Sequence, residues 1–582
     1  MKSLVFDIET DGLQSTKIYC MSVLNTETEE QFNFPPSKIE EGVQLLESAD
    51  KLIGHNIIGF DIPEIKRLHG VNLMSKKIID TLVLSRLFNP IRASHGLKAW
   101  GDTLNFPKME FDNYTRYSDD MMKYCAQDVL LNYKVYQALK SESKGFTSES
   151  VNLETETYKI TCNQRDFGFF MNQEAAQDLL TYFKEELIKA EEEVHKTFKP
   201  KVIKRPLKAQ HTEQGVLKKL GIDKEGKQAR LTSEEYDAMT KGANVVTRIT
   251  EEPFNLGSRQ QIGQYLQEFG WEPQEFTPTG QPKIDETILS KVKDIPEATI
   301  IARYLMLQKR IAQVQSWLSF LRRDRVHGSV ISNGTITGRM SHRDPNLAQV
   351  PSISSPYGKE CRAVWSVPRG YKLVGVDASG LELRMLAHYL KDKEFIDDIL
   401  NGDIHTANQR RAGLQSRNQA KTFIYAFLYG AGDAKIGSIL GGGKREGKRV
   451  KQSFLNNFPT LKSLRNRITR EAEQNEFIKG LDGRKIFIRS SHAALNSLLQ
   501  GAGAIVMKRG LIILNDALQD SDVDAHVVAN VHDEWQLETW HEDVDRLGDM
   551  AVNAIRQAGD YYKLNCPLDA EYKVGENWSE TH

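Results

Sequence analysis

The stretch from Leu373 to Tyr389, LVGVDASGLELRMLAHY, constrains the fold more than any other part of the chain. It opens with the apolar run Leu373–Val376, which does not alternate with polar residues and therefore predicts a strand buried on both faces. The run ends at Asp377, and good helix formers then predict a helix from Leu381 to Ala387. A strand that ends in a carboxylate and leads into a helix carrying Glu382 is a candidate site for a hard divalent cation. The alternative is that Asp377 caps the helix and that Glu382 is a solvated charge.

A second acidic segment, VVANVHDEWQLE, occupies residues 527–538. Its pattern predicts two strands joined by a tight polar tip, which places His532, Asp533 and Glu534 at the top of a hairpin. If this hairpin lies beside the strand that ends at Asp377, the two aspartates are able to bind two metal ions about 3.5–4 Å apart, as in phosphoryl transfer. Taken alone, the three-residue motif has little weight.

A third segment, RNQAKTFIYAFLYGAG, occupies residues 417–432. Arg417, Lys421, Tyr425 and Tyr429 recur every four residues, so they lie along one side of a predicted helix. Two cations one turn apart suit a triphosphate, and the tyrosines offer a surface on which a sugar and a base stack. The alternative is an amphipathic core helix with a basic fringe.

A separate set of acids lies near the N-terminus. Asp7 and Glu9 are two residues apart in a predicted strand and therefore share a face, which is costly unless cations neutralise them. Asp61 is expected at the start of a helix, and Tyr124 and Asp128 are one helical turn apart. Four acids gathered in this way hold two metal ions, and the phenol orients a water for attack on a phosphodiester. Taken singly, Asp61 is explained as a helix cap and Asp128 as a surface charge.

These motifs resemble a known family. The strings DASGLELR (377–384), RNQAKTFIYAFLYG (417–430) and HDE (532–534), in this order and at these separations, resemble the three polymerase motifs of the family A DNA polymerases. The likeness is greatest to the phage replicative branch typified by phage T-seven, and Gly380 favours that branch because repair members usually have glutamine there. The N-terminal acids and their tyrosine resemble DEDDy-type 3′–5′ proofreading exonucleases.

The resemblance implies an α/β (α+β) multidomain fold, with an RNase H-like exonuclease domain followed by a right-hand polymerase of palm, fingers and thumb. A length of 582 residues is consistent with several domains. The expected boundaries are 1–145 for the exonuclease, 146–330 for the thumb, 331–380 and 490–582 for the two parts of the palm, and 381–489 for the fingers. Helical periodicity in 173–198 and 298–321 supports a helical thumb. Between these helices, an insertion at about 199–253 carries a basic run. This run is either a solvated face or a contact with DNA or with a processivity factor.

The resemblance also assigns roles to individual residues. Metal binding falls to Asp377, the carbonyl of Ala378 and Asp533 in the polymerase site, and to Asp7, Glu9, Asp61 and Asp128 in the exonuclease site, with two Mg²⁺ in each and Mn²⁺ as an alternative. Lys421, Glu534 and Tyr124 complete the catalytic set. The incoming nucleotide is expected to contact Arg417, Lys421, Tyr425, Tyr429, His405, Glu382 and Ala378. Primer–template DNA is expected to contact Arg339, Asn346, Gln349, Arg484, Asn496, Gln500 and His532. Singly, each amide is also explained as a capping or surface residue, and a lone histidine is more often structural than functional.

Composition adds few restrictions. The 77 basic and 78 acidic residues leave a net charge of −1, which neither supports nor excludes binding to DNA. The five cysteines form no CxxC pair and have no histidine at zinc-ligand spacing, which favours a reducing compartment and no structural zinc. Asp7 and Glu9 lie where a signal peptide needs apolar residues, and the sequence has no uncharged apolar run of about 18 residues. We therefore predict a cytoplasmic protein without membrane contact, located in the host cytoplasm if a phage encodes it.

The sequence thus predicts a template-directed DNA polymerase that replicates DNA by two-metal nucleotidyl transfer and proofreads with a 3′–5′ exonuclease. Expected partners are primer–template DNA, deoxynucleoside triphosphates and a replicative helicase–primase. Two alternatives remain: a DNA repair polymerase or exonuclease, and a relative of the single-subunit RNA polymerases. The latter lack an N-terminal nuclease and a glutamate at the position of Glu382.

Overall fold

The strand predicted around Asp7 is β1 (Ser3–Thr10), the central strand of a five-stranded sheet with the order β3-β2-β1-β4-β5. Alternate side chains of β1 pack on opposite faces of this sheet, as a period of two requires. Phe6 packs among side chains of α1 and α2, whereas Val5 packs against Val129 of α5. The other elements of this domain are β2 (Ile18–Asn25), β3 (Gln31–Phe34), α1 (Ile39–Glu47), β4 (Lys51–Gly54), α2 (Asp61–His69), β5 (Lys77–Asp80), α3 (Thr81–Phe88), α4 (Leu97–Thr103) and α5 (Asp119–Glu142).

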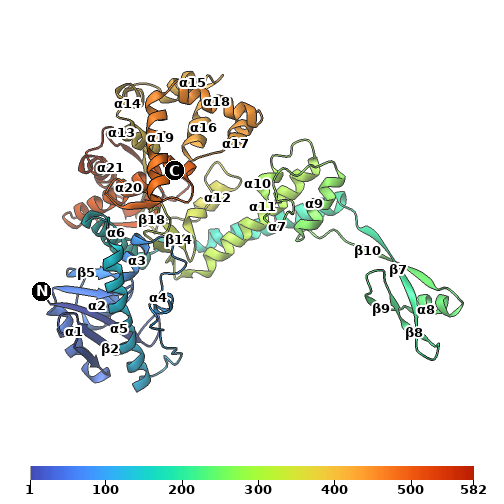
Figure 1. The fold of residues 1–582 in the computed structure, drawn as a ribbon, viewed down its shortest axis with the longest axis horizontal. Coiled ribbons are helices and arrows are strands. Elements are labelled where there is room, and N and C mark those ends of the chain that lie inside the picture. The colour runs from blue at the N-terminus through green and yellow to red at the C-terminus, as the bar shows by residue number, and fades with distance from the viewer. Residues whose placement is uncertain (1) are drawn as a thin grey trace. The chain divides into compact units, whose positions relative to one another are not determined.

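Within the sheet, β2 and β3 are antiparallel neighbours on one side of β1, and β4 and β5 are parallel neighbours on the other. This mixed sheet packed against helices is the RNase H-like domain that the resemblance implies. Figure 1 shows these elements in blue and blue-green at the start of the chain. The structure is a computed structural model, and it describes residues 2–582.

A second sheet, with the strand order β18-β19-β15-β20, holds the stretch that begins at Leu373. Its strands are β15 (Tyr371–Ala378), β18 (Ala525–Val531), β19 (Glu534–Trp540) and β20 (Ala570–Gly575), and all neighbours are antiparallel. Leu373, Val374 and Val376 are completely buried, which confirms the predicted buried strand. Burial of each of these side chains contributes about 1.5–3 kcal/mol.

Two long helices, α20 (Ala494–Gln519) and α21 (Val544–Tyr561), pack into the core of this second sheet. Within the described residues, the segment Ser491–Gln519 is the one helix long and apolar enough to cross a membrane, and 72% of its apolar window is buried inside the protein. Burial on this scale is typical of a core helix.

Seven helices follow β15 and share its apolar core. Figure 1 labels these helices α13 to α19. They are α13 (Leu381–Leu390), α14 (Lys393–Leu400), α15 (Ile404–Ala412), α16 (Arg417–Leu428), α17 (Asp433–Ile439), α18 (Lys444–Asn456) and α19 (Pro459–Asn475). Shorter elements lie elsewhere in the chain. In the N-terminal domain there is the 3-10 turn η1 (Pro36–Lys38). Around the second sheet there are β6 (Phe169–Phe170), β11 (Leu321–Arg322), β12 (Arg325–Val326), β13 (Ser329–Ile331), β14 (Ser341–Arg343), α12 (Gly358–Ala363), β16 (Phe477–Lys479), β17 (Lys485–Phe487), η2 (Leu347–Gln349) and η3 (Ser491–Ala493).

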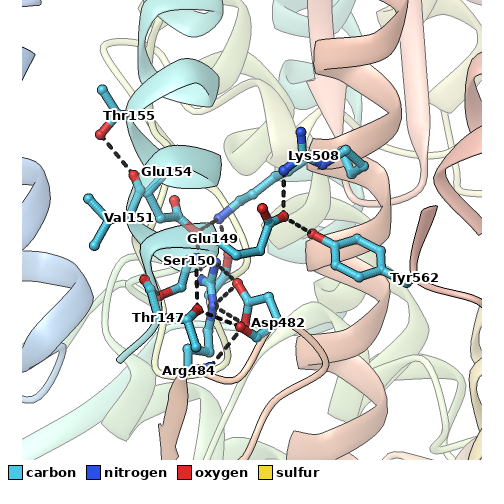
Figure 2. A network of polar contacts seen from close by, with 12 residues as sticks. Thr147, Glu149, Ser150, Val151, Glu154, Thr155, Asp482, Arg484, Lys508 and Tyr562 are labelled. Carbon is cyan, nitrogen blue, oxygen red and sulfur yellow. Dashed lines mark hydrogen bonds and ion pairs between the residues drawn. The ribbon is translucent and has the colours of Figure 1, made fainter. Parts of the chain in front are cut away.

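The helix α6 (Ser148–Phe167) joins the N-terminal domain to the second sheet. Its Glu154 has no exposed surface and bonds both Arg484 and Lys508 of the C-terminal half through Oε1, at 2.6 Å each (Figure 2). Residues up to 173 and residues 320–582 accordingly form one unit, and residues 174–319 form a second. The second unit is thus narrower than the predicted thumb of 146–330, because α6 packs with the first.

The second unit begins and ends with the two predicted long helices, α7 (Gln173–Thr197) and α11 (Pro296–Ser319). Arg303 of α11 joins them by ion pairs with Glu186 and Glu193 of α7. Between them lie α9 (Arg259–Glu268), α10 (Glu286–Leu289) and a small four-stranded antiparallel sheet with the order β10-β7-β8-β9. This sheet consists of β7 (Lys201–His211), β8 (Leu217–Ile222), β9 (Gln228–Arg230) and β10 (Val245–Glu252), with α8 (Ser233–Thr240) packed on one face.

Candidate active sites

The first site lies where β15 ends and β19 begins. Asp377 pairs across the ladder with Glu534, and the backbone N–H of Ala378 donates to the carbonyl of Asp533 at 3.0 Å. The structure therefore brings Asp377 and Asp533 together where the neighbouring strands β15 and β19 meet at one end of the sheet. Asp533 and His532 lie in the turn of the predicted hairpin.

The charges of this site repel one another. Desolvation, followed by the charges of Asp377 and Glu382, raises the pKa of Asp533 to about 7. Desolvation, followed by the charge of Glu534, raises the pKa of Asp377 to about 6, although the Asp377 side chain reaches solvent. A pair of carboxylates that disfavours its own ionisation is stabilised by a divalent cation.

Glu534 differs from these two aspartates because its carboxylate is already bonded. Its Oε1 accepts from Gln536 at 2.6 Å and from Trp578 at 2.5 Å, and its Oε2 lies 2.8 Å from Nδ1 of His582. Although burial opposes ionisation, these bonds and the nearby Arg362 keep the pKa of Glu534 below its usual value. The sequence predicted a catalytic acid near the metals. These contacts instead favour a structural role for Glu534, which fixes the first residue of β19 beside Asp533.

The predicted helix is α16 (Arg417–Leu428), and Tyr429, the last residue of the four-residue repeat, is its C-terminal cap. Ser416 caps it, Phe423 and Ile424 are completely buried, and Arg417 and Lys421 are exposed. The His405 ring of α15 lies 6.1 Å from that of Tyr425, measured between centroids. Desolvation and the charges of Arg417 and Lys421 lower the pKa of His405, so this imidazole lies near both cations and is disfavoured as a cation itself.

The Glu382 side chain bridges the end of α16 and the loop that carries Arg339. Its Oε1 accepts from the hydroxyl of Tyr429 at 2.7 Å and from Nη2 of Arg339 at 3.2 Å. Desolvation and the Glu382 charge raise the pKa of Tyr429 to about 12. The alternative of a freely solvated Glu382 is therefore wrong.

The second site lies on the N-terminal sheet. Asp7 and Glu9 of β1, Asp61 at the start of α2 and Asp128 of α5 influence one another through their charges. Asp61 is 4% exposed and accepts from the N–H of Ile8 at 3.1 Å, so it faces β1 and does not cap its helix. Asp128 is 3% exposed, so it is not a surface charge.

Burial disfavours ionisation throughout this second cluster. Desolvation is the largest cause for each acid, with neighbouring carboxylates adding to it for Asp7 and Glu9. It raises the pKa of Glu9 to about 8 and that of Asp61 to about 7, and it raises those of Asp7 and Asp128. Oδ1 of Asp128 is buried and has no hydrogen-bond partner within residues 2–582. Ligand atoms of Asp7, Glu9 and Cys125 lie within 4.8 Å of one another. The carboxylate oxygens of this cluster, but not the softer Cys125 thiol, fit hard divalent cations, which prefer oxygen ligands.

Comparison with known proteins identifies both parts. Residues 225–580 match DNA polymerase family A, and residues 4–107 match the RNase H superfamily. The DNA-directed DNA polymerase of Escherichia phage T7 is 34% identical over 707 aligned positions that cover 100% of both chains. This chain belongs to the family A DNA polymerases. The enzyme of Enterobacteria phage T3 shows the same identity and coverage. Among solved structures, the POL domain of Pol1 from M. smegmatis, in complex with DNA primer-template and dNTP, shares the fold with a TM-score of 0.79 at 17% identity, covering 100% of this chain and 96% of that one.

Family A polymerases and RNase H-like domains use divalent metal ions, and both clusters of this polymerase supply the carboxylate oxygens that such ions need. The two clusters lie on different sheets. This polymerase therefore has two candidate metal centres, one on each sheet.

Six of the seven residues predicted to contact DNA are at least partly exposed. Arg339 and His532 line one small cavity beside Asp533, and Asn496 lines a larger cavity of about 480 Å³ together with basic side chains of α18 and α19. Gln500 is half-buried one turn after Asn496, Gln349 is exposed, and Asn346 is half-buried. These six positions are compatible with contact to a duplex, and their roles stay predictions.

Arg484 is the exception. Its side chain is 3% exposed, and it bonds Asp482 through Nε at 2.8 Å and Glu154 through Nη1 at 2.6 Å (Figure 2). Lys508, 1% exposed, donates to the same Glu154 oxygen and to the carbonyl of Gly338 at 2.7 Å. The prediction of a direct DNA contact for Arg484 is therefore wrong, because its guanidinium is buried and bonded to Asp482 and Glu154.

Sequence reasoning missed Lys108. Its Nζ forms an ion pair with Oδ2 of Asp128 and lies 4.7 Å from the centre of the Tyr124 ring. Its segment has no regular structure and no periodicity, and it precedes Asp128 by twenty positions. The sequence around Lys108 therefore contains no local pattern that would have identified it as part of the site.

Proposed function

We propose that this family A polymerase synthesises DNA on a template and removes mispaired 3′ ends with its own exonuclease. The observation that carries this proposal is the presence of two carboxylate clusters on two different sheets. One lies beside a helix with exposed cations, and the other lies beside a tyrosine. The first arrangement suits nucleotidyl transfer, and the second suits hydrolysis of a phosphodiester.

In the polymerase site, Asp377, Asp533 and the carbonyl of Ala378 would hold two divalent cations. Mg²⁺ is the expected ion in both sites and Mn²⁺ the alternative, because octahedral sites with oxygen ligands suit both. When bound, such a pair neutralises charge on the attacking and leaving oxygens. Glu534 holds the start of β19 in place through its bonds to Trp578 and His582.

The α16 side chains are proposed to bind the incoming deoxynucleoside triphosphate. Arg417 and Lys421 would neutralise its phosphates, with His405 beside them. Tyr425 would stack against the sugar, and Tyr429 would border the new base pair. Glu382, held by Tyr429 and Arg339, would fill the space that a ribose 2′-hydroxyl requires, which excludes ribonucleotides.

In the exonuclease site, Asp7, Glu9, Asp61 and Asp128 would hold two further cations, and the hydroxyl of Tyr124 would orient the attacking water.

Both sites act on primer–template DNA, for which Arg339, Asn346, Gln349, Asn496, Gln500 and His532 are the proposed contacts. Helix-and-sheet residues 199–253, whose strand β7 exposes Lys204 and Lys208, are proposed to bind DNA or a processivity factor. We propose a cytoplasmic location for the enzyme.

Primer extension tests both activities at once. Wild type, Asp533→Asn and Asp7→Asn are compared on one labelled primer–template with Mg²⁺, with and without deoxynucleotides. We expect Asp533→Asn to lose synthesis and to keep 3′ degradation, and Asp7→Asn to show the reverse. Loss of both activities in either variant, or synthesis from ribonucleotides without a primer, would contradict the proposal.

A further inference from the structure

Lys108 is a half-buried cation inside the acidic exonuclease cluster, and the proposed exonuclease chemistry does not yet use it. Its ammonium pairs with Asp128, whose side chain is 3% exposed, while 23% of the Lys108 side chain remains exposed. Its charge also acts on Asp7 and Glu9. A cation in this position offsets part of the repulsion among four carboxylates.

The same ammonium also touches the tyrosine. It lies over the Tyr124 ring, and Phe111 stacks against that ring with centroids 5.3 Å apart and planes 28° apart. The hydroxyl of Tyr114 lies 3.5 Å from that of Tyr124. Because Tyr124 and Asp128 are one turn apart on α5, one lysine contacts both the tyrosine and the aspartate of this helix.

The segment that carries Lys108 is anchored on both sides. On α4, Gly101 accepts from the N–H of Phe106 at 2.9 Å, and a Cβ at Gly101 would lie 3.0 Å from the backbone nitrogen of Lys108. On α5, Gln127 accepts from the N–H of Met109 at 3.0 Å and donates to the carbonyl of Pro107 at 2.9 Å. The position of Lys108 is therefore fixed by two helices and does not depend on its ion pair alone.

We propose that Lys108 is a positioning residue of the exonuclease, which holds the Asp128 carboxylate and the Tyr124 ring in the orientation that hydrolysis requires. It acts through these two side chains and binds neither metal nor DNA itself. The inference rests on the proposed exonuclease activity. Groups that orient metal-binding side chains typically affect affinity or activity 10–100-fold.

The test measures excision of a mispaired 3′ nucleotide in single turnovers, at saturating DNA and over a range of Mg²⁺ concentrations, with full-length protein. The variants are Lys108→Met, which keeps length and removes charge, and Lys108→Arg, which keeps a cation able to lie over the ring. Lys123→Met is the matched control, because Lys123 lies on α5, the helix that carries Tyr124 and Asp128, is 68% exposed and pairs with Asp120. Primer extension is measured in parallel.

For Lys108→Met we expect a maximal excision rate about 10–100-fold below wild type that stays low at saturating Mg²⁺, with unchanged affinity for DNA and unchanged extension. Lys108→Arg should recover most of the rate, and Lys123→Met should match wild type. The inference is wrong if Lys108→Met excises normally, if high Mg²⁺ restores its rate, or if Lys108→Arg is as slow as Lys108→Met. If wild type itself excises nothing with either Mg²⁺ or Mn²⁺, the proposed exonuclease activity fails as well.

Discussion

Replacing Glu154 by glutamine is expected to destabilise the larger unit of the enzyme, because this one carboxylate balances two buried cations. Arg484 and Lys508 are 3% and 1% exposed, and each bonds Oε1 of Glu154 at 2.6 Å (Figure 2). In Glu154→Gln both cations stay buried, while only Asp482 still carries an opposing charge beside Arg484. Loss of one partner of a buried ion pair costs about 3–5 kcal/mol.

The size of the unit sets the change in melting temperature. Residues 2–173 and 320–582 amount to roughly 430 residues, and an unfolding entropy of about 2.1 cal/mol/K per residue gives about 0.9 kcal/mol/K. The expected loss in Tm for Glu154→Gln is therefore about 3–6 °C. Scanning calorimetry at neutral pH measures it.

The matched control is Glu156→Gln on the same helix. Glu156 is 47% exposed and pairs with Lys159 at 2.9 Å. An exposed pair of this kind contributes about 0.3–0.5 kcal/mol, which corresponds to less than about 1 °C. Equal melting temperatures for the two variants would refute the argument that the buried network stabilises the join between α6 and the C-terminal half.

Two further predictions concern the active sites. Family members with tyrosine at the position of Tyr425 accept dideoxynucleotides, so the resemblance predicts that wild type incorporates them nearly as well as deoxynucleotides. Tyr425→Phe should lose this ability. Competition assays on a primed template measure the preference, and strong discrimination by wild type would contradict the prediction. The pKa values of about 8 for Glu9 and about 7 for Asp61 and Asp533 lie above those of free carboxyl groups, so the folded chain binds more protons than the unfolded chain between these values, and stability without metal falls as pH rises from about 4 to about 8. Because Mg²⁺ replaces these protons, it should raise Tm more at about pH 8.5 than at about pH 6; an equal rise at both pH values in thermal melts would show that these groups do not bind the ion.

The sequence was most informative where function depends on local pattern. The helix α16 begins at Arg417, the first residue of the four-residue repeat, and ends at Leu428, so the last member of the repeat, Tyr429, is its C-terminal cap. The strand β15 ends at Ala378, one residue after the Asp377 that interrupts the apolar run. Alternating apolar side chains and turn residues likewise placed Asp533 in a hairpin that pairs with β15. In each case the apolar spacing that forms the element also fixes the direction of its polar residues.

Residues whose role depends on distant partners were not predictable in this way. Arg484 lies in the polar sequence LDGRK, which is typical of a surface loop, but its partner Glu154 is 330 positions away. Glu534 is bonded by Trp578 and His582, and Lys108 reaches Asp128 from an irregular segment. The sheet of residues 201–252 was missed because most of its strand residues are exposed and show no long apolar alternation.

Anomalous diffraction from crystals of the full-length enzyme grown with Mn²⁺ and primer–template DNA tests the central claim most directly. The account predicts manganese peaks at two separate places: one beside Asp377 and Asp533, and the other among Asp7, Glu9, Asp61 and Asp128. Asp533→Asn should remove the first set of peaks without affecting the second. Peaks at only one cluster, or peaks that persist beside residue 533 in that variant, would contradict the claim that the enzyme has two independent metal centres.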